Sequence, residues 1–120
     1  METHESAENY LETILILRQK HGNVRSIDVA NELGYSKPSV SVAIKKLREN
    51  GFLEVGDTGA LTLTKKGNEV AEQMYERHRC LTDFFVALGV DEETAATDAC
   101  KIEHIISDET FAAIKKLKEQ

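Results

Sequence analysis

The stretch from residue 26 to residue 63 constrains the fold most, because two short amphipathic helices, a tight turn and a hairpin signal follow one another in it. Ser26 and Ser36 are suited to cap the two helices, and Gly34 lies between them, where a turn needs positive φ. Gly56-Asp57-Thr58-Gly59 then separates two short apolar stretches, which predicts a β-hairpin. This order of elements predicts a winged helix-turn-helix.

Helical spacing of apolar residues predicts further helices on both sides of this segment. They are expected at residues 8–19, from Thr64 to about residue 88, at residues 91–106 and at residues 108–118. The hairpin strands are expected at residues 52–55 and 60–63. The fold class is therefore mainly α, with an N-terminal winged helix-turn-helix followed by an all-helical part.

Charge is unevenly distributed along the chain. The net charge is −6, yet residues 37–66 carry six basic and three acidic side chains. This basic segment can still bind phosphate, because physiological salt screens charges beyond about 8 Å. A second helix of this kind offers its polar face to the DNA major groove, and Lys65 and Lys66, where the hairpin returns, suit contacts with the DNA backbone beside the hairpin. The expected DNA-binding residues are Ser36, Lys37, Pro38, Ser39, Ser41, Val42, Lys45, Lys46, Lys65 and Lys66.

A second cluster, Cys100-Lys101-Ile102-Glu103-His104, has metal-ligand chemistry. On a helix, the spacings i, i+3 and i+4 place Cys100, Glu103 and His104 on one face. Thiolate, carboxylate and imidazole all bind divalent transition metals. The alternative for Cys100 alone is a small buried apolar residue, and for the Glu-His pair a surface position. Three ligands do not close a site, and the candidates for the others are His78, Glu8, Asn9 and Glu12.

Taken in order, these segments resemble the diphtheria-toxin-repressor and manganese-transport-regulator family of metal-dependent transcriptional repressors. The resemblance rests on residues 8–12, 36–41, 61–67, 78, 89–91 and 100–104. It implies a cytoplasmic homodimer that binds a palindromic operator on double-stranded DNA, with a divalent metal as corepressor. It also implies a DNA-binding domain over residues 1–66 and a helical metal-binding and dimerisation domain over residues 67–120, without the SH3-like domain of longer members.

The resemblance also implies a set of metal ligands: Glu12, His78, Cys100, Glu103, His104 and Asn9. Cys at position 100 is typical of the iron-type branch, whereas the manganese-type branch has Glu there. Thr82 and Ala96 stand where the ancillary site of the iron-type branch usually has Glu and His. Because a thiolate favours softer ions, we expect Fe(II) first, Mn(II) second and Zn(II) third.

Two other functions fit the same sequence. A thiol-based redox regulator would use Cys80 and Cys100, and would need one acidified thiol or two adjacent ones. A winged-helix protein adaptor would use the acidic C-terminal half as a docking surface. Common enzyme signatures are absent and no apolar run is long enough for a membrane span, so neither an enzyme nor a membrane protein is expected. Two cysteines in 120 residues fit a reducing cytoplasm.

Overall fold

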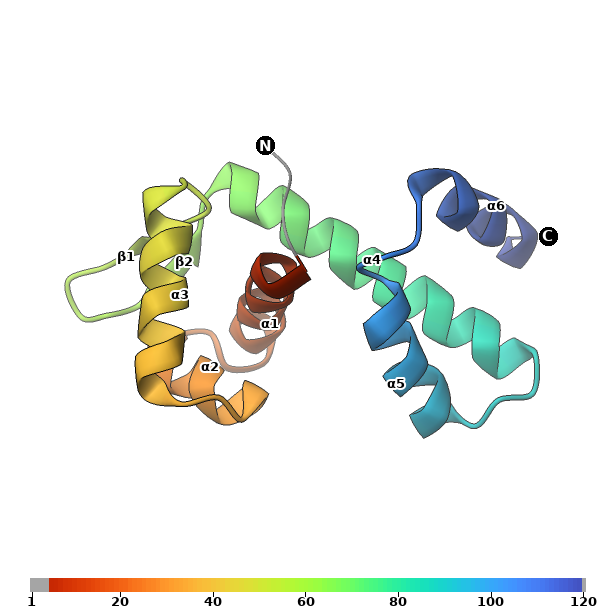
Figure 1. Ribbon diagram of the computed structural model, residues 1–120, viewed down its shortest axis with the longest axis horizontal. Helices are drawn as coiled ribbons and strands as arrows, with labels where there is room; N and C mark the ends of the chain where they lie inside the picture. Colours follow the sequence, from red (N-terminus) through yellow and green to blue (C-terminus); the bar gives the residue numbers. More distant parts are fainter. Residues whose placement is uncertain (1–4, 120) are drawn as a thin grey trace. The chain divides into compact units, whose positions relative to one another are not determined.

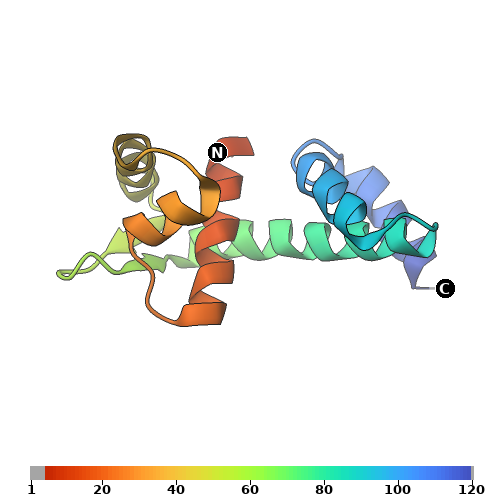
Figure 2. The ribbon, with the colours of Figure 1, turned by 90° about the horizontal axis from the view of Figure 1, so that it is seen from below.

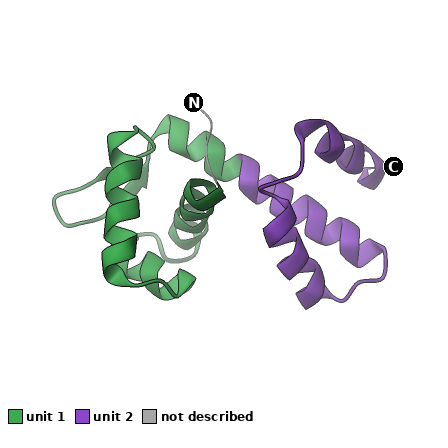
Figure 3. Cartoon of the chain, viewed as in Figure 1, with its two compact units in different colours: residues 1–72 green, residues 73–120 purple. Residues whose placement is uncertain are grey.

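The computed structural model describes residues 5–119, which are mainly helical, as expected. The elements are α1 (Glu5–His21), α2 (Ser26–Leu33), α3 (Lys37–Glu49), β1 (Leu53–Val55), β2 (Leu61–Leu63), α4 (Lys65–Ala87), α5 (Glu92–Ile102) and α6 (Asp108–Lys118). Figure 1 shows their order. The chain divides into two compact units, residues 1–72 and residues 73–120 (Figure 3), and the boundary falls inside α4. Among residues 5–119, no helix combines the length and apolarity needed to span a membrane.

Unit 1 (residues 1–72) has the predicted winged helix-turn-helix architecture. The helices α1, α2 and α3 are followed by an antiparallel hairpin in which Leu53 pairs with Leu63 and Val55 with Leu61. The backbone N–H of Leu61 also donates to the Val24 carbonyl at 2.8 Å, which ties β2 to the segment after α1. The core of the unit is apolar and includes Leu11, Ile14, Val24, Val29, Val40, Leu47, Phe52, Leu53 and Leu61.

Most helix ends in unit 1 follow the local sequence signals. The Ser36 hydroxyl accepts from the Ser39 N–H and begins α3, and Gly34 has the expected positive φ of 72°. The Thr64 hydroxyl accepts from the Gly67 N–H at the start of α4. The predicted Ser26 cap is wrong: Arg25 is the N-cap residue, because the Asp28 carboxylate accepts from the Arg25 backbone N–H at 2.8 Å.

Unit 2 (residues 73–120) contains the rest of α4 together with α5 and α6, which are best followed in Figure 2. Asp91 and Ser107 cap α5 and α6, the helices predicted to start at about these positions. Ion pairs from α6 to α4 join Lys115 to Glu76 and, at 3.2 Å, Lys118 to Asp83.

The predicted length of α5 is wrong. The helix ends at Ile102 instead of residue 106, and Glu103 and His104 lie in the turn that follows it. The directions of these two side chains are therefore set by the backbone of a turn and not by a continuous helical face shared with Cys100.

Candidate metal centre and nucleic-acid interface

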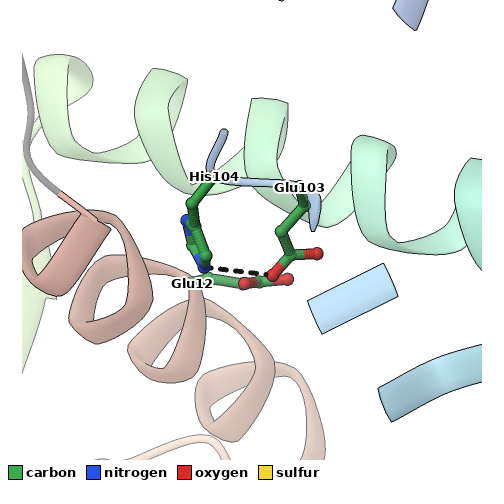
Figure 4. A group of neighbouring side chains, drawn as sticks. All are labelled: Glu12, Glu103 and His104. Atoms are coloured by element: carbon green, nitrogen blue, oxygen red, sulfur yellow. Dashed lines mark ion pairs between the residues drawn. The ribbon is translucent and has the colours of Figure 1, made fainter. Parts of the chain in front are cut away.

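The Glu103 carboxylate is the centre of a cluster of ligand-type side chains in unit 2. Glu103 is 0% exposed. The His78 Nδ1 atom lies 3.1 Å from one of its carboxylate oxygens, and the His104 Nε2 atom lies 3.3 Å from the other. Figure 4 shows the pair formed by Glu103 and His104 as a dashed line. Helix α4 and the turn after α5 thus bring one carboxylate and two imidazoles together.

The chemistry of this cluster fits a divalent transition metal. A buried carboxylate is costly unless cations or donors surround it, and imidazole nitrogens lie 3.1 and 3.3 Å from the oxygens of this one. Two nitrogen ligands and one or two oxygen ligands also form a donor set typical of Mn(II), Fe(II) or Zn(II) sites. Of the predicted ligands, the structure brings His78, Glu103 and His104 together within unit 2.

The other predicted ligands lie on α5 and α1. Cys100 is exposed on α5, two residues before the end of that helix. In unit 1, Glu12 is 5% exposed on α1, and Asn9 is half-buried one turn before it. Buried carboxylates are uncommon outside ion pairs and metal sites, so Glu12 also has the character expected of a ligand.

One residue of this cluster was missed by the sequence analysis. Arg77, which precedes His78 on α4, is buried and donates to the carbonyls of Glu103 at 3.0 Å and Ile106 at 2.8 Å. It also pairs with Asp108 in the first turn of α6. The sequence around Arg77 does not reveal these contacts, because its partners lie 26 to 31 residues further along the chain.

In unit 1, α3 presents a polar, basic face. Its apolar residues Val40, Ile44 and Leu47 are buried. The predicted DNA-binding residues are all exposed: Ser36, Lys37, Pro38, Ser39, Ser41, Val42, Lys45 and Lys46 on or before α3, and Lys65 and Lys66 in the first turn of α4. The exposed Lys45 and Lys46 side chains suit contact with phosphates, and the exposed serine hydroxyls beside them suit contact with base edges.

Two of these residues also have partners inside unit 1. The Ser36 hydroxyl caps α3 and donates to the Ser39 hydroxyl at 2.8 Å. The Lys66 ammonium donates to the Asn50 carbonyl at 3.2 Å and lies 4.4 Å from the centre of the Phe52 ring. Ser36 and Lys66 therefore contribute to the structure of the unit, whatever they contact beyond it.

The hairpin is held by two arginines that the sequence analysis did not single out. Arg18 of α1 donates to the Leu61 carbonyl at 2.7 Å, and Arg25 donates to the Thr58 carbonyl in the turn between the strands. Because Leu61 pairs with Val55 next to the turn, both contacts fix the turn end of the wing to the helical part of unit 1.

Comparison with known proteins gives two matching family models. The iron dependent repressor N-terminal DNA binding domain matches residues 2–61. The iron dependent repressor metal binding and dimerisation domain matches residues 64–120.

Curated relatives and solved structures agree with these matches. The transcriptional regulator MntR of Escherichia coli O6:H1 is 35% identical over 92% of this chain and 72% of its own length. An uncharacterised HTH-type transcriptional regulator of Methanocaldococcus jannaschii is 34% identical over 97% of this chain and 94% of its own length. A manganese-dependent transcriptional repressor in complex with manganese superposes with a TM-score of 0.84 and 33% identity, covering 92% of this chain and 51% of its own.

The manganese regulator SloR superposes with a TM-score of 0.83 and 26% identity, over 99% of this chain and 55% of its own. The chain thus spans about half the length of these solved structures. The family resemblance inferred from the sequence is confirmed: the chain belongs to the iron-dependent repressor family of metal-responsive, DNA-binding transcriptional regulators, with a DNA-binding domain followed by a metal-binding and dimerisation domain.

Proposed function

We propose that this protein is a homodimeric repressor that binds a palindromic DNA operator when a divalent metal is held by the cluster around Glu103. Residues 1–66 would contact DNA, and residues 67–120 would bind the metal and the second subunit. The observation that carries this proposal is the fully buried Glu103 carboxylate, which has an imidazole nitrogen near each of its oxygens.

The proposed ligands are His78, Glu103 and His104, together with Glu12, Cys100 and Asn9. The first three are supported by their mutual distances of 3.1 and 3.3 Å. Glu12 is supported by its burial on α1 and by its carboxylate. Cys100 and Asn9 are included because the family resemblance implies them.

We propose Mn(II) as the preferred ion, ahead of Fe(II) and Zn(II), which exchanges the first two ions in the order expected from the Cys100 thiolate. Among the proteins named above are the regulator MntR, a manganese-dependent repressor solved with manganese, and a protein described as a manganese regulator. Carboxylate and imidazole ligands suit Mn(II), whereas thiolate shifts the preference towards Fe(II) and Zn(II).

Metal dependence requires that the ion bind the DNA-competent arrangement of the protein more tightly than the alternatives. A tenfold gain in DNA affinity corresponds to about 1.4 kcal/mol of differential binding. A bound divalent cation would supply the positive charge that offsets a buried carboxylate such as that of Glu103.

The test begins with DNA fragments selected from a random pool by the protein in the presence of Mn(II). Affinity for one selected fragment is then measured by fluorescence anisotropy, with Mn(II) and with EDTA. We expect Mn(II) to raise the affinity at least tenfold for the natural protein. Equal affinity in the two conditions would remove metal as the effector.

A matched pair of variants tests whether the gain in DNA affinity caused by Mn(II) depends on the cluster around Glu103. Glu103→Gln removes the buried carboxylate charge and should abolish the gain caused by Mn(II). Glu109→Gln makes the same change at an exposed position in the first turn of α6 and should keep it. Both variants should retain weak, salt-sensitive binding to unselected DNA, because the basic face of α3 is unchanged.

A further inference from the structure

We propose that Arg77 is a positioning residue of the metal centre: its guanidinium fixes the turn that carries Glu103 and His104. This inference rests on the proposed function, because it concerns the same metal centre. Arg77 itself is not a ligand, since a guanidinium is always charged and has no lone pair to offer a cation.

The contacts of Arg77 converge on the backbone of the turn. Its Nη1 atom donates to the carbonyl of Glu103 at 3.0 Å and to that of Ile106 at 2.8 Å. These two acceptors lie at the beginning and near the end of the turn that follows α5. A single nitrogen on α4 therefore spans the turn and determines how far its two ends can separate.

The other end of the guanidinium anchors the turn to α6. The Nη2 atom pairs with Asp108, and the guanidinium carbon lies 5.4 Å from the centre of the Phe111 ring. The Arg77 side chain is 7% exposed, whereas that of Asp108 is 86% exposed. Solvent therefore screens the ion pair more than the carbonyl contacts, which are the buried part of the network.

The position of Arg77 on α4 links these contacts to the ligands. Arg77 and His78 are consecutive, so the same helical turn supplies one imidazole and holds the backbone that carries Glu103 and His104. Glu103 and His104 follow the end of α5, so no continuous helix fixes their directions. Residues that orient ligands without binding the metal often change affinity 10- to 100-fold when they are replaced.

The experiment compares Arg77→Met with Lys115→Met. Arg77→Met keeps an unbranched apolar stem and removes every donor to the turn. Lys115→Met removes the ion pair that joins α6 to α4 through Glu76, without touching the turn. For each protein we would measure Mn(II) affinity by calorimetry, the visible absorption spectrum of the Co(II) form, and the thermal stability of the metal-depleted protein.

We expect Arg77→Met to weaken Mn(II) binding 10- to 100-fold and to alter the position and intensity of the Co(II) bands. Lys115→Met should match the natural protein in both readouts, even where its metal-depleted form is less stable. The Co(II) spectrum reports ligand geometry, so general destabilisation does not reproduce this result.

Arg77→Lys separates charge from geometry and serves as the folded alternative if Arg77→Met does not fold. It keeps the positive charge but cannot bridge both carbonyls and Asp108 at once. We expect a weakened affinity and an altered Co(II) spectrum here as well. Natural affinity and spectrum in Arg77→Lys would overturn the positioning role while leaving the proposed function intact. Failure of the natural protein to bind Mn(II) or Co(II) would overturn the proposed function itself.

Discussion

At the scale of single residues, Gly67 is the position where the backbone leaves least room. A Cβ atom added there would lie 1.9 Å from the Phe52 carbonyl oxygen and 2.9 Å from its carbon. Those atoms belong to the backbone just before β1, so no side-chain rotation relieves the clash. We expect Gly67→Ala to lower the free energy of unfolding by about 3 kcal/mol, measured by urea denaturation.

Gly56→Ala is the control for this prediction. Gly56 lies in the hairpin turn, its φ is not positive, and an added Cβ would be an ordinary 3.7 Å from the Ala60 carbonyl oxygen. The free energy of unfolding of Gly56→Ala should stay within about 1 kcal/mol of that of the natural protein. If Gly67→Ala were as stable as Gly56→Ala, α4 would not begin so close to Phe52.

The two cysteines differ in burial, and their reactivity can therefore distinguish a metal sensor from a thiol-based redox sensor. Burial raises the pKa of the Cys80 thiol, so a smaller fraction is thiolate at neutral pH. Cys100 is exposed. At pH 7.5 we expect iodoacetamide to modify Cys100 much faster than Cys80, as read by mass spectrometry of the intact protein and its peptides.

The function of Cys80 can be tested directly. Cys80→Ala should leave the Mn(II)-dependent gain in DNA affinity unchanged, because Cys80 is outside the proposed ligand set. A lost response in Cys80→Ala, or rapid alkylation of Cys80, would favour the redox regulator. Slower alkylation of Cys100 when metal is present would support its assignment as a ligand.

At the scale of helices and strands, local chemistry predicted the starts of elements better than their ends. The helices after Ser36, Thr64, Asp91 and Ser107 start about where the sequence predicts, because each of these side chains accepts from an N–H three residues ahead, a contact contained in the local sequence. The start of α2 was misplaced by one residue, because Asp28 accepts from the Arg25 N–H and Ser26 is not the cap.

The end of α5 could not be predicted from local sequence. Residues 103–106 contain no glycine or proline that would stop a helix. In the folded unit, Arg77 takes the carbonyls of Glu103 and Ile106 as acceptors. This tertiary contact competes with continued helical hydrogen bonding, and only the three-dimensional structure reveals it.

The cap of α6 provides a prediction at this scale. The Ser107 hydroxyl accepts from the Thr110 N–H at 3.1 Å. Ser107→Ala removes that acceptor and should lower the free energy of unfolding by about 1 kcal/mol, measured by thermal or urea denaturation. Ser107→Asn, which restores a capping oxygen, should recover most of the loss. Equal stabilities for the Ala and Asn variants would mean that the cap contributes nothing.

At the scale of the whole molecule, the charge pattern distinguishes the DNA-binding face from the rest of the surface. The chain is acidic overall, while exposed basic residues gather on α3 and at the start of α4. Lys45→Gln should reduce the slope of log affinity against log salt by about one for DNA binding, because one phosphate contact is lost. Lys116→Gln, an exposed lysine on α6, should leave the slope unchanged.

How much of the site could be predicted also differs between the two units. On α3, polar and apolar residues alternate with helical spacing, so the exposed face was visible in the sequence. In unit 2, the ligand types His78, Glu103 and His104 were recognised from their chemistry. Their supporting residue Arg77 was not, because its contacts join α4 to residues far along the chain.

The complete burial of Glu103 has a consequence for the rate at which the protein takes up metal. A carboxylate with no surface open to solvent meets an incoming ion only when the surrounding chain opens transiently. Uptake would then proceed at the frequency of that opening, and adding more ion beyond a certain concentration would not accelerate it. A regulator built in this way would average over brief fluctuations in supply and respond to sustained ones.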